Sequence, residues 1–264
     1  MPPKDGGVAS KLKSAREIEL MRQAGRVVHR VLQRLGSLVV PGTTTLELDR
    51  EAERLTAELG AESLFKGVPG RGGPFPGTIC ASLNEEVVHG IPSGRAIREG
   101  DVVSIDYGCR LNGYCGDAAV TFLPGKGSPR SERLVEATRH VMDLAIEMAK
   151  PGMLWSQIAQ AMQDYVHEQG FSVVREFVGH GIGKEMWEEP KVPNFVSREL
   201  LARDILLQEG LVIAVEPMVT MGSPDVLVGR DGWTVVTRDG LSAAHFEHTL
   251  AITGDDVQVL TDGN

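Results

Sequence analysis

The sequence predicts an α+β fold made of two similar halves, about residues 14–125 and 126–264. The first observation behind this prediction is a pair of helix–break–helix units with identical spacing. In each unit a Pro-Gly dipeptide separates two amphipathic stretches, and a glycine ends the second stretch. The units run from Pro41 to Gly60 and from Pro151 to Gly170.

The second observation is that two strand segments match each other. Residues 99–106 align without a gap with residues 209–216, and both segments end in a carboxylate, Asp106 in one and Glu216 in the other. The third is that His89-Gly-Ile recurs at His180-Gly-Ile. One such match is readily due to chance, but three matches in the same order favour an internal duplication. A pseudo-two-fold arrangement would then place Asp106 and Glu216 across a shared site.

The totals limit the class of protein. A chain of 264 residues with 42% hydrophobic residues is long enough for a substantial core. We expect residues 1–13 to form a flexible arm and residues 14–264 a single catalytic domain. A net charge of −9 argues against nucleic acid as a main partner, because phosphate binding needs a basic surface.

The cysteines and the apolar runs predict a cytoplasmic location. Three cysteines, an odd number, indicate a reducing compartment, although Cys109 and Cys115 lie close enough across a predicted hairpin to leave a disulfide open. The first residues carry no apolar signal segment, and no apolar run approaches 18 residues, so we expect no membrane span.

The helices follow from caps and periodicity. A capping box, Ser14-Ala-Arg-Glu17, opens a helix that reaches about residue 38, and a second helix covers about residues 46–59. In the second half, Ser131 and Ser156 are the expected N-caps of helices that extend to about residues 150 and 170.

Between and after the helices the chain predicts short strands and loops. Residues 67–77 are rich in Gly and Pro and predict a loop, and residues 184–208 look polar and irregular. The strands are expected at residues 79–83, 86–89, 102–122 as a hairpin, 211–216 and 246–252.

The hairpin brings two carboxylates together. Asn112-Gly113 is a strong two-residue turn signal, and it sets Asp117 opposite Gly108. Asp106 then shares a face with Asp117 as a diagonal neighbour, roughly 7–8 Å away. Two carboxylates aimed at one point repel unless a cation lies between them, and a divalent metal ion is the natural candidate.

We expect five residues to converge on this point, Asp106, Asp117, His180, Glu216 and Glu247, of which the duplication relates Asp106 to Glu216. Any one carboxylate alone is as readily explained by a surface hydrogen bond. Four of them on apolar strands, with no obvious Arg or Lys beside them, would be very costly to bury unpaired. Oxygen ligands with one imidazole suit Mn, Fe, Co or Zn, and shared carboxylates can bridge a metal pair.

Several separated motifs resemble the type I methionine aminopeptidases in their short bacterial form. They are Asp106 and Asp117 eleven positions apart, Gly179-His-Gly-Ile-Gly183, Val215-Glu-Pro-Met218 and Phe246-Glu-His-Thr249, within a likeness from Ser14 to about Leu260. The resemblance implies the pita-bread fold, a curved antiparallel sheet covered by helices. It also implies removal of the initiator methionine from nascent polypeptides when the second residue is small.

The resemblance assigns metal roles to the five residues. Asp106 corresponds to the bidentate ligand of one metal ion, and Asp117 and Glu247 to bridging carboxylates. His180 and Glu216 correspond to ligands of a second ion, and Glu216 also to the proton acceptor for the attacking water. Two divalent ions are therefore expected, of Co, Mn, Fe or Zn.

The resemblance also assigns the substrate side. His89 corresponds to a histidine that contacts the scissile amide and donates a proton. Phe75, Cys80 and Trp233 fall where the family lines the methionine pocket, although Cys80 and Trp233 would also suit an ordinary core.

One segment departs from the family. After His180, the family has an aromatic residue and a second substrate-contacting histidine, whereas this chain has Met186 and Trp187. Trp donates one indole N–H but does not change protonation near neutral pH. The loop at residues 67–77 also lacks the tyrosines expected at the pocket edge. We therefore expect altered or lowered turnover and a reshaped entrance.

Two other functions stay open at this point. One is that of an Xaa-Pro-type peptidase of the same fold, which usually carries a large extra N-terminal domain. The other is that of a non-catalytic pita-bread binding protein, which typically loses metal ligands. The expected partners are N-termini of nascent polypeptides at the ribosome, with no nucleic-acid or membrane partner, and a monomer is the default.

Overall fold

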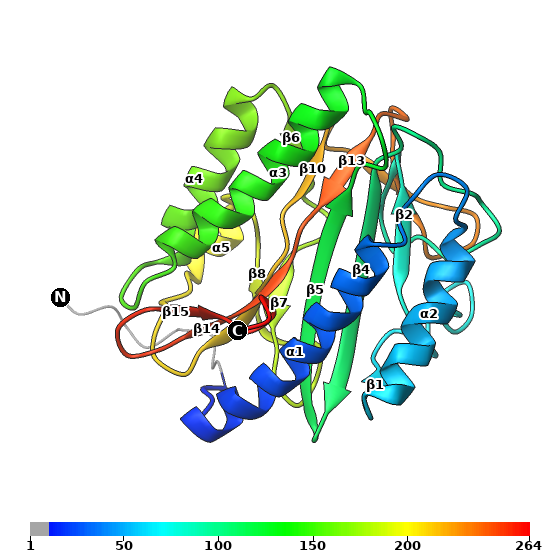
Figure 1. Cartoon of the computed structure of the whole chain (residues 1–264). Coiled ribbons are helices and arrows are strands. Elements are labelled where there is room, and N and C mark those ends of the chain that lie inside the picture. Colours follow the sequence, from blue (N-terminus) through cyan, green and yellow to red (C-terminus); the bar gives the residue numbers. More distant parts are fainter. Residues whose placement is uncertain (1–10) are drawn as a thin grey trace.

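A computed structural model describes residues 11–264, and in it the chain is an α+β structure (Figure 1). The helices are α1 (Ala15–Gly36), α2 (Thr45–Glu58), α3 (Pro129–Met148), α4 (Trp155–Glu168) and the short α5 (Arg198–Ala202). Most of the predicted arm, residues 1–10, lies outside the described part. Within residues 11–264, no helix is both long and apolar enough to cross a membrane.

The strands of the described residues form four small antiparallel sheets. In the first, β4 (Val103–Leu111) pairs with β1 (Glu62–Ser63), β2 (Cys80–Leu83) and β5 (Tyr114–Phe122). The second contains β6 (Ser172–Val173), β10 (Met218–Thr220) and β13 (Ala243–His245), and the third contains β3 (Glu86–Val88), β12 (Val235–Thr237) and β11 (Val226–Val228). The fourth has the order β15 (Val257–Val259), β14 (His248–Ile252), β9 (Val212–Val215), β7 (Gly179–Gly181) and β8 (Glu188–Val192).

The predicted duplication is confirmed by repeated backbone contacts. Thr44 bridges Ala96 in the first half and Leu154 bridges Leu206 in the second, so both partners are displaced by the same 110 positions. The helices α2 and α4 have the same length, 14 residues, and begin and end at the same displacement. The two halves therefore share one helix–strand scaffold.

The hairpin is confirmed in register. Asn112 and Gly113 have φ angles of 52° and 80°, as a type I′ turn requires, and Gly108 pairs with Asp117 as predicted. The backbone N–H of Ala119 and that of Glu247 each donate to the other's carbonyl, at 3.2 and 2.9 Å. This bridge joins β5 of the first half to the second half.

Two helix starts differ from the predictions. The α3 helix begins three residues early, because Ser128 accepts from the Ser131 backbone N–H and Pro129 occupies the first turn, where its missing N–H costs nothing. The α4 helix is preceded by Leu154, which provides no side-chain cap, and the predicted cap Ser156 lies inside the helix.

The prediction that residues 184–208 are irregular was wrong, and the structure answers the question of a disulfide that the sequence left open. Residues 184–208 contain β8 and α5, both too short to show a clear period in sequence. All three cysteines are free thiols, so the hairpin carries no disulfide.

The helices cover the sheets with separate apolar cores. One core joins α1 and α2 to β2 and β4 through residues such as Val31, Leu48 and Ile105. Another joins α3 and α4 to β9 and β10 through residues such as Trp155 and Ile213. Figure 1 shows α1 crossing the β4–β5 hairpin, with α3 and α4 over β6 and β10.

Candidate active site

A cavity of about 120 Å³ lies where the strands of the two halves meet. It is bounded on one side by carboxylates and imidazoles and on the other by apolar side chains. Every residue that the sequence nominated lines it. The lining residues are Phe65, Val68, Phe75, Cys80, His89, Asp106, Asp117, His180, Met186, Trp187, Glu216, Trp233 and Glu247.

The hairpin supplies two of the carboxylates. Asp106 stands on β4 opposite Ala119, and Asp117 stands on β5 opposite Gly108, so the two share one face of the hairpin. Thr249 of β14 fixes the backbone of Asp117 from both sides, because its hydroxyl accepts from the Asp117 N–H at 3.1 Å and donates to the Asp117 carbonyl at 2.8 Å. The position of Asp117 therefore depends on both halves.

The second half supplies His180, Glu216 and Glu247. The Nδ1 of His180 lies 2.9 Å from the carbonyl oxygen of Gly181, which can only accept, so Nδ1 carries the ring proton and Nε2 keeps a free lone pair. Asn194 donates its side-chain N–H to the Glu216 carbonyl at 2.9 Å. A histidine whose other nitrogen is held in this way is the usual form of a metal ligand.

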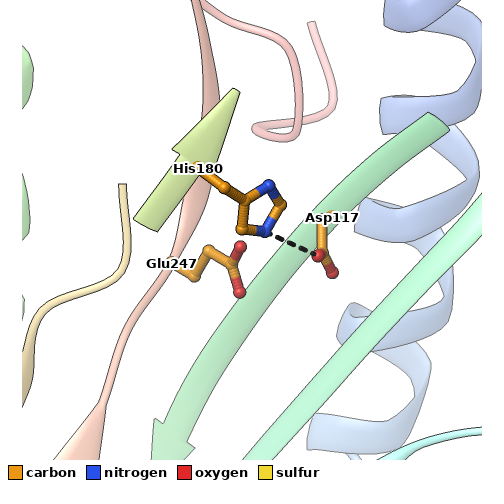
Figure 2. A group of neighbouring side chains, drawn as sticks. All are labelled: Asp117, His180 and Glu247. Atoms are coloured by element: carbon orange, nitrogen blue, oxygen red, sulfur yellow. Dashed lines mark ion pairs between the residues drawn. The ribbon is translucent and has the colours of Figure 1, made fainter. Parts of the chain in front are cut away.

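The side chains of Asp117, His180 and Glu247 point at one another (Figure 2). The Nε2 of His180 lies 3.9 Å from Asp117 Oδ2 and 3.8 Å from Glu216 Oε1. One ligand atom each of Asp117, His180 and Glu247 lies within 4.8 Å of the other two. This spacing is that of donor atoms arranged around a common centre rather than bonded to each other.

The four carboxylates lack the cation that their burial demands. In the described part of the chain no Lys or Arg pairs with them. Loss of solvent contact raises the pKa of Asp117 to about 7, and the same loss, with repulsion from Asp117, raises the pKa values of Asp106, Glu216 and Glu247 well above the usual range.

Three of these carboxylates also hold a buried oxygen without a hydrogen-bond partner among residues 11–264, namely Asp106 Oδ1, Asp117 Oδ1 and Glu247 Oε1. Buried polar atoms normally have partners, so these oxygens identify a place for a ligand. Four hard oxygen donors and one imidazole with a free Nε2 fit divalent metal ions, which would also reverse the pKa shifts.

His89 faces the same cavity from the end of β3 with an unusual backbone. Its φ angle is 59°, in the left-handed region that residues other than glycine seldom adopt, and its ring packs edge-on against Phe177 at 5.4 Å. Burial lowers the pKa of His89 to about 4, so its ring is neutral. Strained backbone of this kind is typical of functional sites.

The apolar side of the cavity is a compact aromatic and sulfur-containing wall. Phe65, Phe75, Cys80 and Met186 form one buried cluster, and the Trp233 ring meets Phe75 edge-on at 5.1 Å. The Trp233 indole N–H donates to the Gly73 carbonyl at 3.0 Å, and burial raises the pKa of the Cys80 thiol, which stays neutral.

A steric contact explains a glycine in the Gly-rich loop at residues 67–77. A Cβ at Gly70 would lie 2.2 Å from the Trp233 ring, so only glycine allows the backbone to lie flat against that indole. The loop forms the rim of the apolar wall, where the sequence predicts the pocket edge.

Trp187 lies at the mouth of the cavity and is 58% exposed, whereas Met186 beside it is buried. The next residue, Glu188, forms a buried ion pair at 2.7 Å with Lys13, whose backbone N–H donates to the Gly210 carbonyl. The chain just before α1 therefore anchors the loop that carries Trp187, and the part of the arm nearest Ser14 is fixed at Lys13.

Sequence reasoning missed three residues here. Phe65 and Val68 line the cavity, and only their apolar character before a Gly-rich loop could have indicated them. His245 was also missed, although its Nε2 lies 4.0 Å from both Glu216 Oε2 and Glu247 Oε2. It lies two positions before Glu247, and the period of an extended chain would have placed both on one face.

Comparisons with known proteins identify the family of this chain. Residues 19–254 match the model of metallopeptidase family M24. The chain is 45% identical over 249 residues to methionine aminopeptidase 1 of Bacillus subtilis (strain 168), covering 94% of this chain and 98% of that protein.

The solved structures give the same picture. The crystal structure of the methionine aminopeptidase of Thermotoga maritima superposes with a TM-score of 0.90 at 40% identity, covering 96% of this chain and 99% of that one. The prolidase of Pyrococcus furiosus shares the fold, with a TM-score of 0.75 at 23% identity, but this chain spans only 65% of it.

Proposed function

The chain belongs to metallopeptidase family M24, and on that premise we propose that it removes the N-terminal methionine from polypeptides by metal-dependent hydrolysis when the second residue is small. The observation that carries this proposal is a cavity in which metal-ligand side chains face an apolar wall. The length and identity of the match to methionine aminopeptidases favour this function over an Xaa-Pro peptidase.

We propose two divalent metal ions in this cavity. Asp106 would bind one ion, His180 and Glu216 the other, and Asp117 and Glu247 both. The donor set accepts Co, Mn, Fe or Zn. The unpartnered carboxylate oxygens and the free Nε2 of His180 support this assignment.

The division of labour follows from where the side chains lie. Bound divalent ions supply Lewis acidity that activates water and polarises the scissile carbonyl. Glu216 lines the cavity beside the ligand cluster, where its carboxylate can accept a proton. His89 is neutral and lines the same cavity, from where it can hydrogen-bond the scissile amide.

The apolar wall would bind the methionine side chain of the substrate. The cluster around Phe65, Phe75 and Cys80 offers flat aromatic and polarisable surface, which suits an unbranched thioether. Trp233 closes this wall. Met186 and Trp187 would contact the substrate near the entrance, where the second residue of a peptide has to lie.

The wider setting follows from the same proposal. We propose that residues 14–264 act as one catalytic domain, that the protein is a monomer in the cytoplasm, and that its substrates are nascent polypeptides at the ribosome. A net charge of −9 is consistent with recognition of a polypeptide N-terminus rather than of RNA itself.

A peptide series tests the function directly. Metal-depleted protein is reloaded with Mn, Co, Fe or Zn in separate samples and assayed on Met-Ala-Ser, Met-Leu-Ser, Leu-Ala-Ser and Ala-Pro-Ser. We expect release of Met from the first peptide only, with no activity before metal is added. Cleavage of Ala-Pro-Ser alone would instead support an Xaa-Pro peptidase, and metal binding without any turnover would support a binding protein. The Asp117→Asn variant is the matched control, since it keeps the side-chain shape and loses the charge.

A further inference from the structure

Among residues 11–264, His245 is the one imidazole at the ligand cluster to which neither the motifs nor the proposed function gives a role. It is the last residue of β13, where it pairs with Met218 of β10. Its backbone is fixed to β5, because its N–H donates to Thr121 Oγ1 at 2.9 Å and the Thr121 hydroxyl donates to its carbonyl at 2.7 Å. The side chain therefore leaves a rigid point of the sheet.

The imidazole is buried next to two proposed ligands. His245 is 2% exposed, and its Nε2 has no hydrogen-bond partner in the described part of the chain. The charged atoms facing it are Glu216 Oε2 and Glu247 Oε2, each 4.0 Å away. Both are carboxylate oxygens, which accept hydrogen bonds when ionised.

Leaving a buried nitrogen without a hydrogen-bond partner is destabilising. The groups around Nε2 can satisfy it only as acceptors, so the tautomer with a proton on Nε2 is favoured. A movement of about 1 Å by either carboxylate would bring it within normal hydrogen-bond distance.

We propose that His245 is a positioning residue whose Nε2–H donates to Glu216 or Glu247 and fixes the orientation in which these carboxylates hold metal. It acts through the ligands and is not itself a ligand. This inference rests on the proposed function, because it requires that the two carboxylates bind divalent ions. Outer-shell partners of this kind typically change metal affinity by about 10–100-fold when they are removed.

Two substitutions of His245 by amide side chains of different length test the inference. In His245→Gln the side-chain amide extends to about the position of Nε2 and can donate to the carboxylates, whereas in His245→Asn it stops near the position of Nδ1. We expect Asn to weaken Mn binding by about 10–100-fold in calorimetric titration of the metal-free protein, and Gln to restore most of the affinity. On Met-Ala-Ser the Asn variant should lose kcat more than it raises KM.

His248→Asn is the matched control. His248 is also a histidine beside Glu247 in sequence, but its Nδ1 bonds Thr261 Oγ1 at 2.8 Å, away from the ligand cluster. Asn can keep that bond, so Mn affinity should stay at the wild-type value. Equal affinity in wild type, His245→Gln and His245→Asn would overturn the inference, and so would equal losses in Gln and Asn.

A second measurement needs no folded variant other than Gln. Nitrogen-labelled histidine in the wild type should show a slowly exchanging Nε2–H signal that disappears in His245→Gln. Its absence in the metal-loaded protein overturns the inference. The proposed function fails in a different way, since wild-type protein would then bind no divalent metal or release no methionine.

Discussion

The two halves of the molecule share a scaffold and differ at the site. The Pro-Gly breaks, the second helices and the Thr44–Ala96 and Leu154–Leu206 bridges repeat at one displacement. The first half contributes a hairpin with two carboxylates, whereas the second contributes a histidine on β7 and single carboxylates beside β9 and β14. The scaffold thus decides where side chains arrive, and the individual residues decide which chemistry they bring.

The two His-Gly-Ile segments show the difference best. His180 lies on β7, donates its Nδ1 proton to the Gly181 carbonyl, and points its free nitrogen at carboxylates. His89 has a left-handed backbone and packs on Phe177, and no ion pair links it to the carboxylates among residues 11–264. Although their sequences are similar, the two segments suit different roles: His180 that of a metal ligand and His89 that of a histidine that contacts the substrate.

Substituting each histidine separately is the strongest test of the different roles of His180 and His89. We expect His180→Ala to lose one metal ion and almost all activity, because a ligand is removed. We expect His89→Ala to keep both ions and to lose about 10²–10⁴-fold in kcat, the usual contribution of a proton-transfer group. Elemental analysis and kinetics on Met-Ala-Ser measure both effects.

Full metal content in His180→Ala would contradict the assignment of ligands. A loss of metal in His89→Ala would remove the distinction between the two segments. The matched control is His140→Ala, on the α3 helix outside the cavity, which should behave as wild type.

The loop after His180 brings Trp187 to the cavity mouth, and Lys13 anchors this loop through Glu188. We expect Trp187→His to raise kcat on Met-Ala-Ser about tenfold, equivalent to about 1.4 kcal/mol in the barrier, because it adds a second imidazole near the substrate carbonyl. Trp187→Phe, which only removes the indole N–H, is the control, and identical rates in all three proteins would exclude Trp187 from the reaction.

The carboxylates of both halves predict a pH effect on stability. Asp117 has a pKa near 7 in the folded metal-free protein, against about 3.9 when unfolded. Between these values the folded state holds the proton and the unfolded state does not, so stability is lost as the pH rises from about 4 to about 7. The metal-free protein should therefore melt at a lower temperature at pH 8 than at pH 5, by roughly 2–4 °C per kcal/mol lost.

Added Mn should reverse that trend, since it favours the ionised ligands, and Asp117→Asn should reduce the slope in the metal-free protein. Calorimetric melting curves measure all three. A metal-free protein that becomes more stable from pH 5 to pH 8 would show that these carboxylates are not the groups that decide its stability.

Local chemistry explains how much of the fold the sequence predicted. The hairpin register followed from Asn112-Gly113 because two adjacent positive φ angles leave one turn type. The start of α3 did not follow, because Ser128 and Ser131 are both good caps and a proline after Ser128 is as typical of a loop as of a first helical turn. The segment with β8 and α5 was missed because each element has only 5 residues, too few to show a clear period. The strand β8 forms because it pairs with β7.

The candidate site was predictable to the extent that motifs carry it. The nominated residues all line one cavity because strands of both halves contribute to it. His245 was missed because the two-residue period that relates it to Glu247 indicates no role until the fold places it against Glu216. Phe65 and Val68 could not be distinguished from ordinary core residues by sequence.

The smallest predicted effect concerns the N-cap residues of α2 and α4, which occupy equivalent positions in the two halves. Thr44 and Leu154 occupy equivalent N-cap positions with similar backbone angles, but only Thr44 accepts a backbone N–H, at 3.2 Å from Glu47. Gln157 already accepts from the Leu154 N–H, so Leu154→Thr would complete a capping box. We expect a gain of about 1 kcal/mol and no change in activity, against a loss of about 1 kcal/mol in Thr44→Ala, both measured by denaturant unfolding. Since Leu154 is 40% exposed, little apolar burial is lost, and a destabilised Leu154→Thr would show that its contact beside Leu206 outweighs the cap.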